Sequence, residues 1–352
     1  MADKVLMKGN QAIAEAAVQA NCEFYAGYPI TPQNEIPEYM SKRMYDLGRV
    51  FIQSESELAA INMVFGASAA GARAMTSSSS PGISLKQEGI SYIAAAELPC
   101  VIVNMVRGGP GLGNISGAQS DYFQSTRGGG HGDYRLIVLA PSSVQEAYDL
   151  TMNAFDLADI YRNPVMILGD GYLGQMIEPL ELKEYKKPAN LPAKDWALTG
   201  CKGRKPHVVK TLYLIPPELL IKHNIHLQEK YGRIKKEFCL YEEAETKDAE
   251  LIIVAYGIAA RVCKGAVLKA RKEGIKVGLL RPITLWPFPE KIISDLADKA
   301  KRFLVVEMSM GQMVDDVRLA VNGKKPVEFF GNAGGWMPSS DMILDKIKEL
   351  KL

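Results

Sequence analysis

The stretch VIVNMVRGGPGLGN, from Val101 to Asn114, joins an apolar run to a glycine-rich loop. The apolar part, Val101–Val106, has no charged residue, which is typical of a strand buried on both faces of a parallel sheet. Arg107 stands where that strand should end. Ligands of α/β sheets bind beyond the carboxyl ends of the strands, so this junction predicts a binding site.

Apolar runs alternate with helix-like patterns on both sides of this stretch. Helices are expected at 8–20, 31–46, 57–72 and 144–157, and strands at 22–28, 50–53, 136–140 and 165–168, while 73–77 leads to a serine run. The alternation resumes at about residue 250, with strands at 251–255, 276–280, 303–306 and 327–330 and helices at 259–273, 290–300 and 313–321. This pattern predicts an α/β fold with mostly parallel sheets covered by helices on both faces.

A polar segment separates the two α/β regions. Between 183 and 248 Lys, Pro and Glu are frequent and the periodicity is weak. This segment is either a long excursion that covers a surface or a partner, or a solvated linker with one helix at 217–231. We therefore expect domains at 1–182 and 249–352, joined by residues 183–248.

Composition excludes several classes of protein. The 352 residues are 47% hydrophobic and 23% charged, with a net charge of +2, so no global field attracts nucleic acid or anionic lipid. No apolar run is long enough to span a bilayer, and the first residues lack the pattern of a signal peptide. The five cysteines form no C-x-x-C pair. We expect a cytoplasmic chain without its own iron–sulfur cluster, so electrons of a redox reaction would leave through another polypeptide.

Three segments contain candidate site residues, each with a structural alternative. Thr31 and Pro32 suit the N-cap and first position of a helix, whose N-terminus could bind a carboxylate or phosphate, or Thr31 only caps that helix. Glu57 has capping-box spacing from Ser54, but it could also be a carboxylate that exchanges a proton near neutral pH. Arg107 could clamp a carboxylate through two parallel hydrogen bonds, or form a structural ion pair.

Other motifs give weaker or negative indications. Asn114 replaces the third glycine of a dinucleotide fingerprint and no Walker lysine follows, so both nucleotide motifs are excluded. His131, in the loop Gly128–Gly132, is a weak acid–base candidate. Asp170 lies in a Gly-Asp-Gly motif that opens magnesium sites in thiamine diphosphate enzymes, but no asparagine pair follows it. We therefore expect a strand-end turn there and no metal site in this chain.

Together these motifs resemble the alpha subunit of 2-oxoacid:ferredoxin oxidoreductases over nearly the whole chain. The matching segments are Tyr28–Pro32, Glu57 ahead of Gly66–Gly71, and Arg107–Pro110. The segments Gln119–Tyr122, Gly128–Gly132 and Asn163–Met176 are similar to the branched-chain, 2-oxoisovalerate type, and Leu280–Pro282 and Glu307 look like those of a transketolase C-terminal-type domain.

The resemblance implies a thiamine diphosphate-binding, pyrimidine-type domain followed by a transketolase C-terminal-like domain. It also implies site roles: Glu57 bonds the N1′ nitrogen of the cofactor, with Pro29 and Ile30 beside it, while Thr31 and Arg107 bind the substrate carboxylate. Asn114 and His131 would be loop contacts.

The resemblance also implies the reaction and the partners. The reaction would be oxidative decarboxylation of 2-oxoisovalerate to its acyl-coenzyme A, with electrons passed to ferredoxin. A beta subunit would hold the diphosphate, Mg²⁺ and an iron–sulfur cluster, and separate gamma and ferredoxin-type delta subunits would complete the complex.

Three alternatives remain. A 2-oxoglutarate enzyme would need another cation for the second carboxylate, which Arg127 or Arg135 could supply. A non-catalytic scaffold subunit is a hypothesis of another class, although Thr31, Glu57 and Arg107 together argue against a decayed site. A nicotinamide dehydrogenase is disfavoured by the missing dinucleotide fingerprint.

Overall fold

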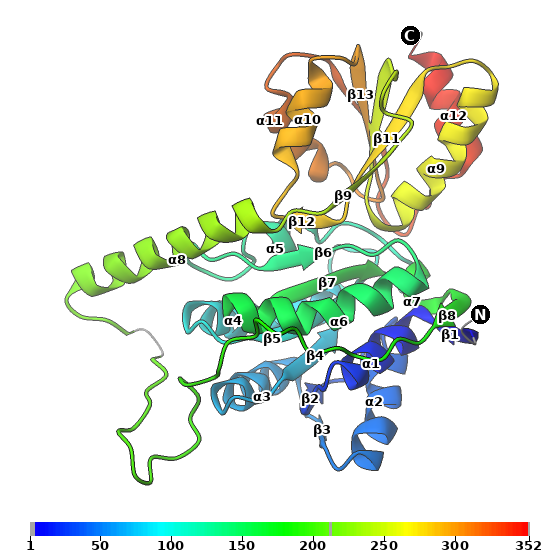
Figure 1. The fold of residues 1–352 in the computed structure, drawn as a ribbon. Helices are drawn as coiled ribbons and strands as arrows, with labels where there is room; N and C mark the ends of the chain where they lie inside the picture. Colours follow the sequence, from blue (N-terminus) through cyan, green and yellow to red (C-terminus); the bar gives the residue numbers. More distant parts are fainter. Residues whose placement is uncertain (1–3, 211–212, 351–352) are drawn as a thin grey trace.

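The computed structural model describes residues 4–210 and 213–350, which form two sheet-containing regions, one above the other (Figure 1). The larger sheet has the strand order β12-β6-β7-β5-β4-β2-β3, and the smaller one β14-β13-β10-β11-β9. Strands pair in parallel except at β12 and β9, which lie on sheet edges. The predicted α/β class with mostly parallel sheets is confirmed.

Helices pack around the larger sheet, and most of them alternate with its strands along the chain. Its strands are β2 (Phe24–Gly27), β3 (Val50–Gln53), β4 (Ala74–Ser78), β5 (Cys100–Val106), β6 (Ile137–Leu139), β7 (Val165–Asp170) and β12 (Thr284–Trp286). Its helices are α1 (Gly9–Gln19), α2 (Glu35–Asp46), α3 (Glu57–Ala69), α4 (Ser80–Ala95), α5 (Tyr122–Thr126), α6 (Val144–Tyr161) and α7 (Gly171–Gln175). A separate antiparallel pair joins β1 (Lys4–Lys8) to β8 (Ile177–Glu181). Every residue of the central strand β5 is buried, as its apolar run predicts.

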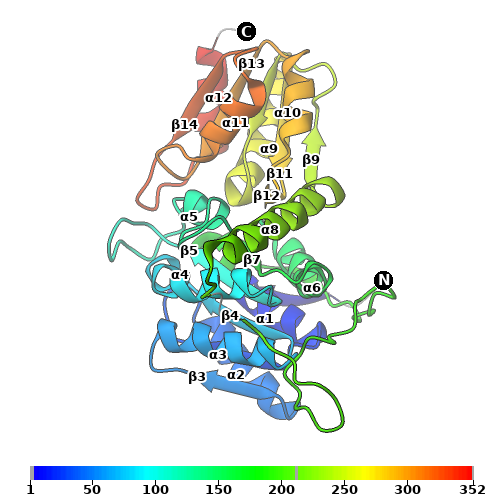
Figure 2. The ribbon, with the colours of Figure 1, turned by 90° about the vertical axis from the view of Figure 1, so that its left-hand side faces the viewer.

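The smaller sheet has the same architecture. It contains β9 (Tyr241–Ala244), β10 (Leu251–Val254), β11 (Val277–Pro282), β13 (Arg302–Glu307) and β14 (Val327–Gly331). Helices α9 (Gly257–Lys272), α10 (Glu290–Ala297), α11 (Met313–Val321) and α12 (Ser340–Glu349) pack around it (Figures 1 and 2). The sequence pattern did not predict α12, nor α4, which follows a serine run typical of a loop.

Two short strands interlock the regions. β9 lies within the segment 183–248, yet it pairs with β11 of the smaller sheet. β12 follows β11 in the chain, yet it pairs antiparallel with β6 of the larger sheet. Arg281, at the end of β11, donates to both carboxylate oxygens of Glu146 on α6 and to Glu242 on β9. Each region therefore includes a strand that chain order alone would assign elsewhere.

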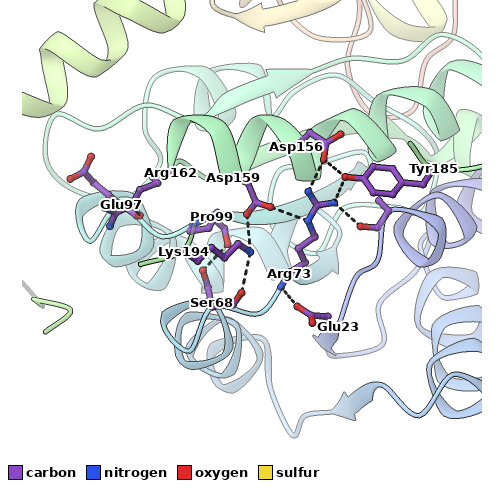
Figure 3. Close-up of polar contacts among 12 residues, drawn as sticks. Glu23, Ser68, Arg73, Glu97, Pro99, Asp156, Asp159, Arg162, Tyr185 and Lys194 are labelled. Carbon is purple, nitrogen blue, oxygen red and sulfur yellow. Dashed lines mark hydrogen bonds and ion pairs between the residues drawn. The ribbon is translucent and has the colours of Figure 1, made fainter. Parts of the chain in front are cut away.

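The polar segment is attached to the larger-sheet region. Arg73 lies between Asp156 and Asp159, and the Tyr185 hydroxyl is bonded to Arg73 and to Asp156 (Figure 3). The ion pairs of Arg73 with Asp156 and Asp159 are 2.6 and 2.9 Å long. Lys194 lies 2.9 Å from Asp159. The charged side chains of Arg73, Asp156 and Asp159 are largely buried and therefore need partners. Their contacts with Tyr185 and Lys194 fix residues 185–194 to the larger-sheet region.

Helix α8 (Pro217–Glu237) lies where the two regions meet in both views (Figures 1 and 2). Its Lys230 is 3.3 Å from Glu97, at the end of α4, and its His226 is 3.1 Å from the same carboxylate. Residues 185–194 and the second half of α8 thus lie against the rest of the chain, whereas residues 198–206 and the first half of α8 are largely exposed.

One predicted helix start and one predicted helix cap are wrong. Helix α2 begins at Glu35 with Asn34 as N-cap, so Thr31 caps no helix and Pro32 is not at its first position. The chain turns first, with the Gln33 amide bonded to the Ile30 carbonyl. Helix α3 is capped by Ser56, which accepts from the Ala59 amide, and not by Ser54. The Ser54 hydroxyl instead donates to the carbonyl of Gly27 at the end of β2, a contact invisible to local spacing.

Two further features concern membranes and metals. No helix in the described ranges combines the length and apolar character needed to cross a bilayer. Across the same residues, no group of three or more His, Cys, Asp or Glu side chains has the arrangement of a metal site.

Candidate active site

The carboxyl ends of four adjacent strands form the candidate site. Strands β3, β2, β4 and β5 are neighbours in the larger sheet and run parallel, so their carboxyl ends lie at one edge. Thr31 follows β2, Glu57 follows β3 and Arg107 follows β5. The structure therefore brings the three principal predicted residues to the same edge, with Pro29 and Ile30 just before Thr31.

Arg107 connects two loops at this edge. Its side chain is nearly buried, and its Nη1 and Nη2 donate to the carbonyl oxygens of Thr31 at 3.0 Å and Leu112 at 2.9 Å. Its backbone amide donates to the Ser80 hydroxyl. Because the carbonyls hold the guanidinium in one orientation, its other N–H groups are aimed before any ligand arrives.

Glu57 is a buried carboxylate in the first turn of α3, only 6% exposed. Within the described ranges, no hydrogen bond to its carboxylate is found. Gly82 of α4 packs directly against it, and a Cβ atom at that glycine would lie 2.7 Å from Glu57 Oε1 and collide with Ser78 Oγ. Leaving a buried carboxylate unbonded costs free energy, so its bonding capacity is available for a group that this chain does not contain.

Unbonded polar atoms gather around the same edge. Among the described residues, the buried atoms without a hydrogen-bond partner include Gln33 Nε2, Ser78 Oγ, Ser79 Oγ and Arg107 Nε. The Gln33 side chain is held in place by buried hydrogen bonds: Ser77 donates to its Oε1, and the Tyr25 hydroxyl bonds Ser77 at 2.6 Å. Sequence analysis missed Gln33, Ser78 and Ser79. Only the position of the serine run after a strand could have indicated the serines.

Asp170 has a local role at the next strand. Its Oδ1 accepts from the amides of Tyr172 at 2.9 Å and Leu173 at 3.1 Å, which caps the short helix α7. Complete burial raises the pKa of Asp170 to about 7, although the two amides act in the opposite direction. Its carboxylate is thus committed to the backbone.

The weaker candidates lie in other surroundings. Asn114 accepts from the Ser116 amide and donates to the Gly334 carbonyl at 2.9 Å, which ties the glycine loop to the smaller-sheet region. His131 lies in a separate pocket between α4 and α8, lined by Tyr92 and His223 among others. Arg127 pairs with Asp316 at 2.8 Å.

Comparison with known proteins identifies the family. A family profile described as "Pyruvate flavodoxin/ferredoxin oxidoreductase, thiamine diP-bdg" matches residues 15–242, and "Pyruvate:ferredoxin oxidoreductase core domain II" matches residues 249–343. The ketoisovalerate oxidoreductase subunit VorB of Methanothermobacter thermautotrophicus is 53% identical over 345 residues, 98% of this chain and 97% of the relative. This chain belongs to the 2-oxoacid:ferredoxin oxidoreductase family. The resemblance stated from the sequence is confirmed.

Other members of this family are more distant. The 2-oxoglutarate synthase subunit KorA of Methanothermobacter marburgensis is 36% identical over all of both chains. The solved 2-oxoglutarate:ferredoxin oxidoreductase from Magnetococcus marinus, with 2-oxoglutarate, coenzyme A and succinyl-CoA bound, superposes with a TM-score of 0.87 at 27% identity. It covers 99% of this chain, which spans 65% of the length of that chain.

The fold is also shared with a transketolase. A split-gene transketolase described as an inactive beta4 tetramer has a TM-score of 0.61 at 12% identity and covers 97% of both chains. At this identity the likeness concerns the fold alone. It agrees with the predicted order of a thiamine diphosphate-binding domain followed by a transketolase-like α/β domain.

Proposed function

We propose that this chain is the alpha subunit of an enzyme that oxidatively decarboxylates 2-oxoisovalerate to its acyl-coenzyme A and passes the electrons to ferredoxin. The observation that supports the proposal best is the buried Glu57 carboxylate at the same sheet edge as the preoriented Arg107 guanidinium. The branched-chain substrate is favoured because the relative at 53% identity is named for ketoisovalerate.

The residues at this edge fit the aminopyrimidine of thiamine diphosphate. Glu57 offers a carboxylate with free bonding capacity, and Gly82 leaves room beside it. Glu57 would hold the proton shared with the N1′ ring nitrogen, Pro29 and Ile30 would line the ring, and Gln33 Nε2 and Ser78 Oγ supply unbonded polar atoms. When bound, thiamine diphosphate supplies the electron sink for decarboxylation.

Arg107 and Thr31 would bind the carboxylate of the 2-oxoacid. Arg107 uses two N–H groups on backbone carbonyls, which leaves Nε and the remaining Nη hydrogens for a charge-assisted bond. The Thr31 hydroxyl bonds only loosely to Asn34, at 3.3 Å, and can turn toward the same ligand. Neither residue has to move far, because both loops are fixed.

Partner chains would complete the site. Apolar side chains are exposed beside the candidate residues: Tyr28 before Pro29, Leu58 after Glu57, Leu85 on α4 and Leu112 on the glycine loop. A beta subunit covering this face would bury them and bring the diphosphate, Mg²⁺ and an iron–sulfur cluster, for which this sequence has neither the asparagine pair nor a C-x-x-C pair. Gamma and ferredoxin-type delta subunits would complete the electron path.

Reduction of ferredoxin or a viologen dye by the co-purified complex tests the reaction. With coenzyme A present, 2-oxoisovalerate should be oxidised faster than 2-oxoglutarate or pyruvate, and the isolated chain should be inactive. Faster oxidation of 2-oxoglutarate would contradict the proposed branched-chain substrate but would agree with the family assignment. No oxidation of any 2-oxoacid by a complex with bound thiamine diphosphate would favour the non-catalytic scaffold.

Glu57→Gln tests the role of the carboxylate in the same complex. The variant should assemble normally and lose turnover, since an amide cannot hold the shared proton. The exposed Glu55, two residues away, gives the matched control Glu55→Gln, which should retain activity. Normal turnover in Glu57→Gln would remove this residue from the mechanism.

A further inference from the structure

Lys86 is a lysine buried inside the larger-sheet region. It lies in the middle of α4 with no exposed surface, and its Nζ donates to Thr76 Oγ1 on β4 at 2.9 Å. An ammonium group has three N–H donors, and Thr76 is its one hydrogen-bond partner among the described residues. A buried cation bonded to one neutral hydroxyl is costly, so burial favours the neutral amine unless a nearby negative charge stabilises the ammonium.

The packing of α4 on α3 places Lys86 on the helix face that meets α3, one turn from the contact with Glu57. Gly82, Lys86 and Gly89 are spaced by four and three residues, so they share one face of α4. The two glycines on that face pack against α3: Gly82 meets Glu57 and Gly89 meets Ile61, one turn further along. Lys86 therefore lies between two close contacts of the same helix pair, one turn from the Glu57 contact.

Glu57 is the one charged group in the described structure that acts on Lys86. Burial lowers the pKa of Lys86 to about 7, and the Glu57 carboxylate opposes this change by favouring the charged amine. The sequences of α3 and α4 contain three charged residues, of which the third, Glu88, is exposed. Thr76 on β4 is uncharged. The compensating charge for Lys86 is thus the same carboxylate that lies at the candidate site.

We propose that Lys86 is a positioning residue, whose buried positive charge holds the Glu57 carboxylate against α4 in the orientation that bonds the cofactor ring. The inference rests on the proposed role of Glu57. Lys86 acts through that carboxylate and touches neither substrate nor cofactor. Without the ammonium group, the carboxylate would be free to turn toward solvent or toward other polar groups at the sheet edge.

Thiamine diphosphate binding to the cofactor-depleted complex tests the proposal by calorimetry. Lys86→Met keeps the length of the side chain without its charge and should weaken binding about tenfold. Lys230→Met is the matched control, because Lys230 on α8 is also buried and is paired with a glutamate, Glu97, at the end of α4. It should leave the cofactor affinity unchanged. Equal affinity in Lys86→Met and the unaltered complex would overturn the proposal.

The pH dependence separates positioning from simple packing. Since the pKa of Lys86 is about 7, the ammonium is lost as the pH rises through this value, and the affinity for thiamine diphosphate should fall. In Lys86→Met this part of the pH dependence should disappear, whereas a packing defect would lower the affinity equally at every pH. A pH profile of Lys86→Met parallel to that of the unaltered complex contradicts the proposal.

If Lys86→Met fails to fold, a titration of the unmutated Lys86 still tests the proposal. In the full-length chain with ¹³C-labelled lysine, the Lys86 signal should titrate near pH 7, and at lower pH in Glu57→Gln, because Glu57 raises its pKa. Glu55→Gln should leave the titration unchanged. If Glu57→Gln does not move the titration, the charge pair is wrong even if Glu57 proves essential. If the titration moves but Glu57→Gln retains turnover, the proposed function of Glu57 fails instead.

Discussion

The guanidinium Nη1 of Arg107 lies 3.0 Å from the carbonyl oxygen of Thr31, across 76 residues of sequence. This bond joins the end of β5 to the loop after β2, and a second bond to Leu112 holds the glycine loop to the same side chain. The carbonyls thus orient the arginine before a ligand binds. Preorganisation of this kind lowers the ordering cost of binding.

Replacing Arg107 should impair substrate binding more than cofactor binding. Arg107→Ala loses a charge-assisted bond to the 2-oxoacid, so kcat/KM should fall by about tenfold to a hundredfold, mainly through KM. Arg107→Lys keeps the positive charge but loses the forked pair of N–H donors, so its kcat/KM should lie between those of Arg107→Ala and the unaltered complex. Steady-state kinetics of the complex provide the measurement, with Arg135→Ala as the control because the Arg135 side chain bonds only the Tyr134 carbonyl among the described residues. An unaltered KM in Arg107→Ala would exclude this residue from the substrate site.

A methyl group at Gly82 should displace Glu57 without changing any charge. A Cβ atom there would lie 2.7 Å from Glu57 Oε1 and collide with Ser78 Oγ. Both are ends of side chains that can move aside, so Gly82→Ala should fold but bind thiamine diphosphate more weakly. Gly66→Ala is the control on α3, where a Cβ meets open space and helix propensity should improve stability by about 0.5–1 kcal/mol. Cofactor affinity and thermal denaturation distinguish the two. Full affinity in Gly82→Ala would show that Glu57 need not occupy its present position.

Arg281 should stabilise the junction between the two sheet regions. Its three bonds to Glu146 and Glu242 are 2.8–2.9 Å long, and its side chain is 8% exposed. Arg281→Met removes the cation paired with Glu146, whereas Glu242 keeps Lys264 at 3.1 Å, so the free energy of unfolding should fall by about 1–3 kcal/mol. Arg318→Met, which removes an exposed pair with Asp315, should change it by less than about 0.5 kcal/mol. Equal urea midpoints for both variants would show that the pairing of β9 and β12 stabilises the junction without the ion pairs of Arg281.

Asp170 should make stability fall as the pH rises toward neutrality. Its folded-state pKa is raised to about 7 by burial, above the ordinary value of 3.8, so the folded chain binds a proton that the unfolded chain releases between these values. Stability from this group is therefore present below about pH 4 and lost as the pH rises through 7. Asp170→Asn retains an oxygen for the α7 amides and should raise the melting temperature by a few degrees at pH 8, but little at pH 4. A gain of the same size at both pH values would contradict the titration.

Local patterns predicted most of the elements because each depends on residues close in sequence. The strand at Val50–Gln53 and the helix at Met313–Val321 have the predicted bounds, and the Val101–Val106 run is the buried centre of the sheet. Thr31, Glu57 and Arg107 could be named as candidates because each follows a predicted strand. In a parallel sheet, the carboxyl ends of adjacent strands meet at one edge.

The sequence by itself therefore determined the α/β class and the family resemblance, and it named the three principal candidate residues. Only the tertiary structure decided that β12 returns to the larger sheet, that α2 starts at Glu35, and that the glycine face of α4 packs against Glu57. Each of these depends on groups far apart in the chain. In the same way, the Ser54 hydroxyl donates to the distant Gly27 carbonyl and does not cap α3 as predicted. Periodicity records which face of an element is buried, but not which distant residue that face meets.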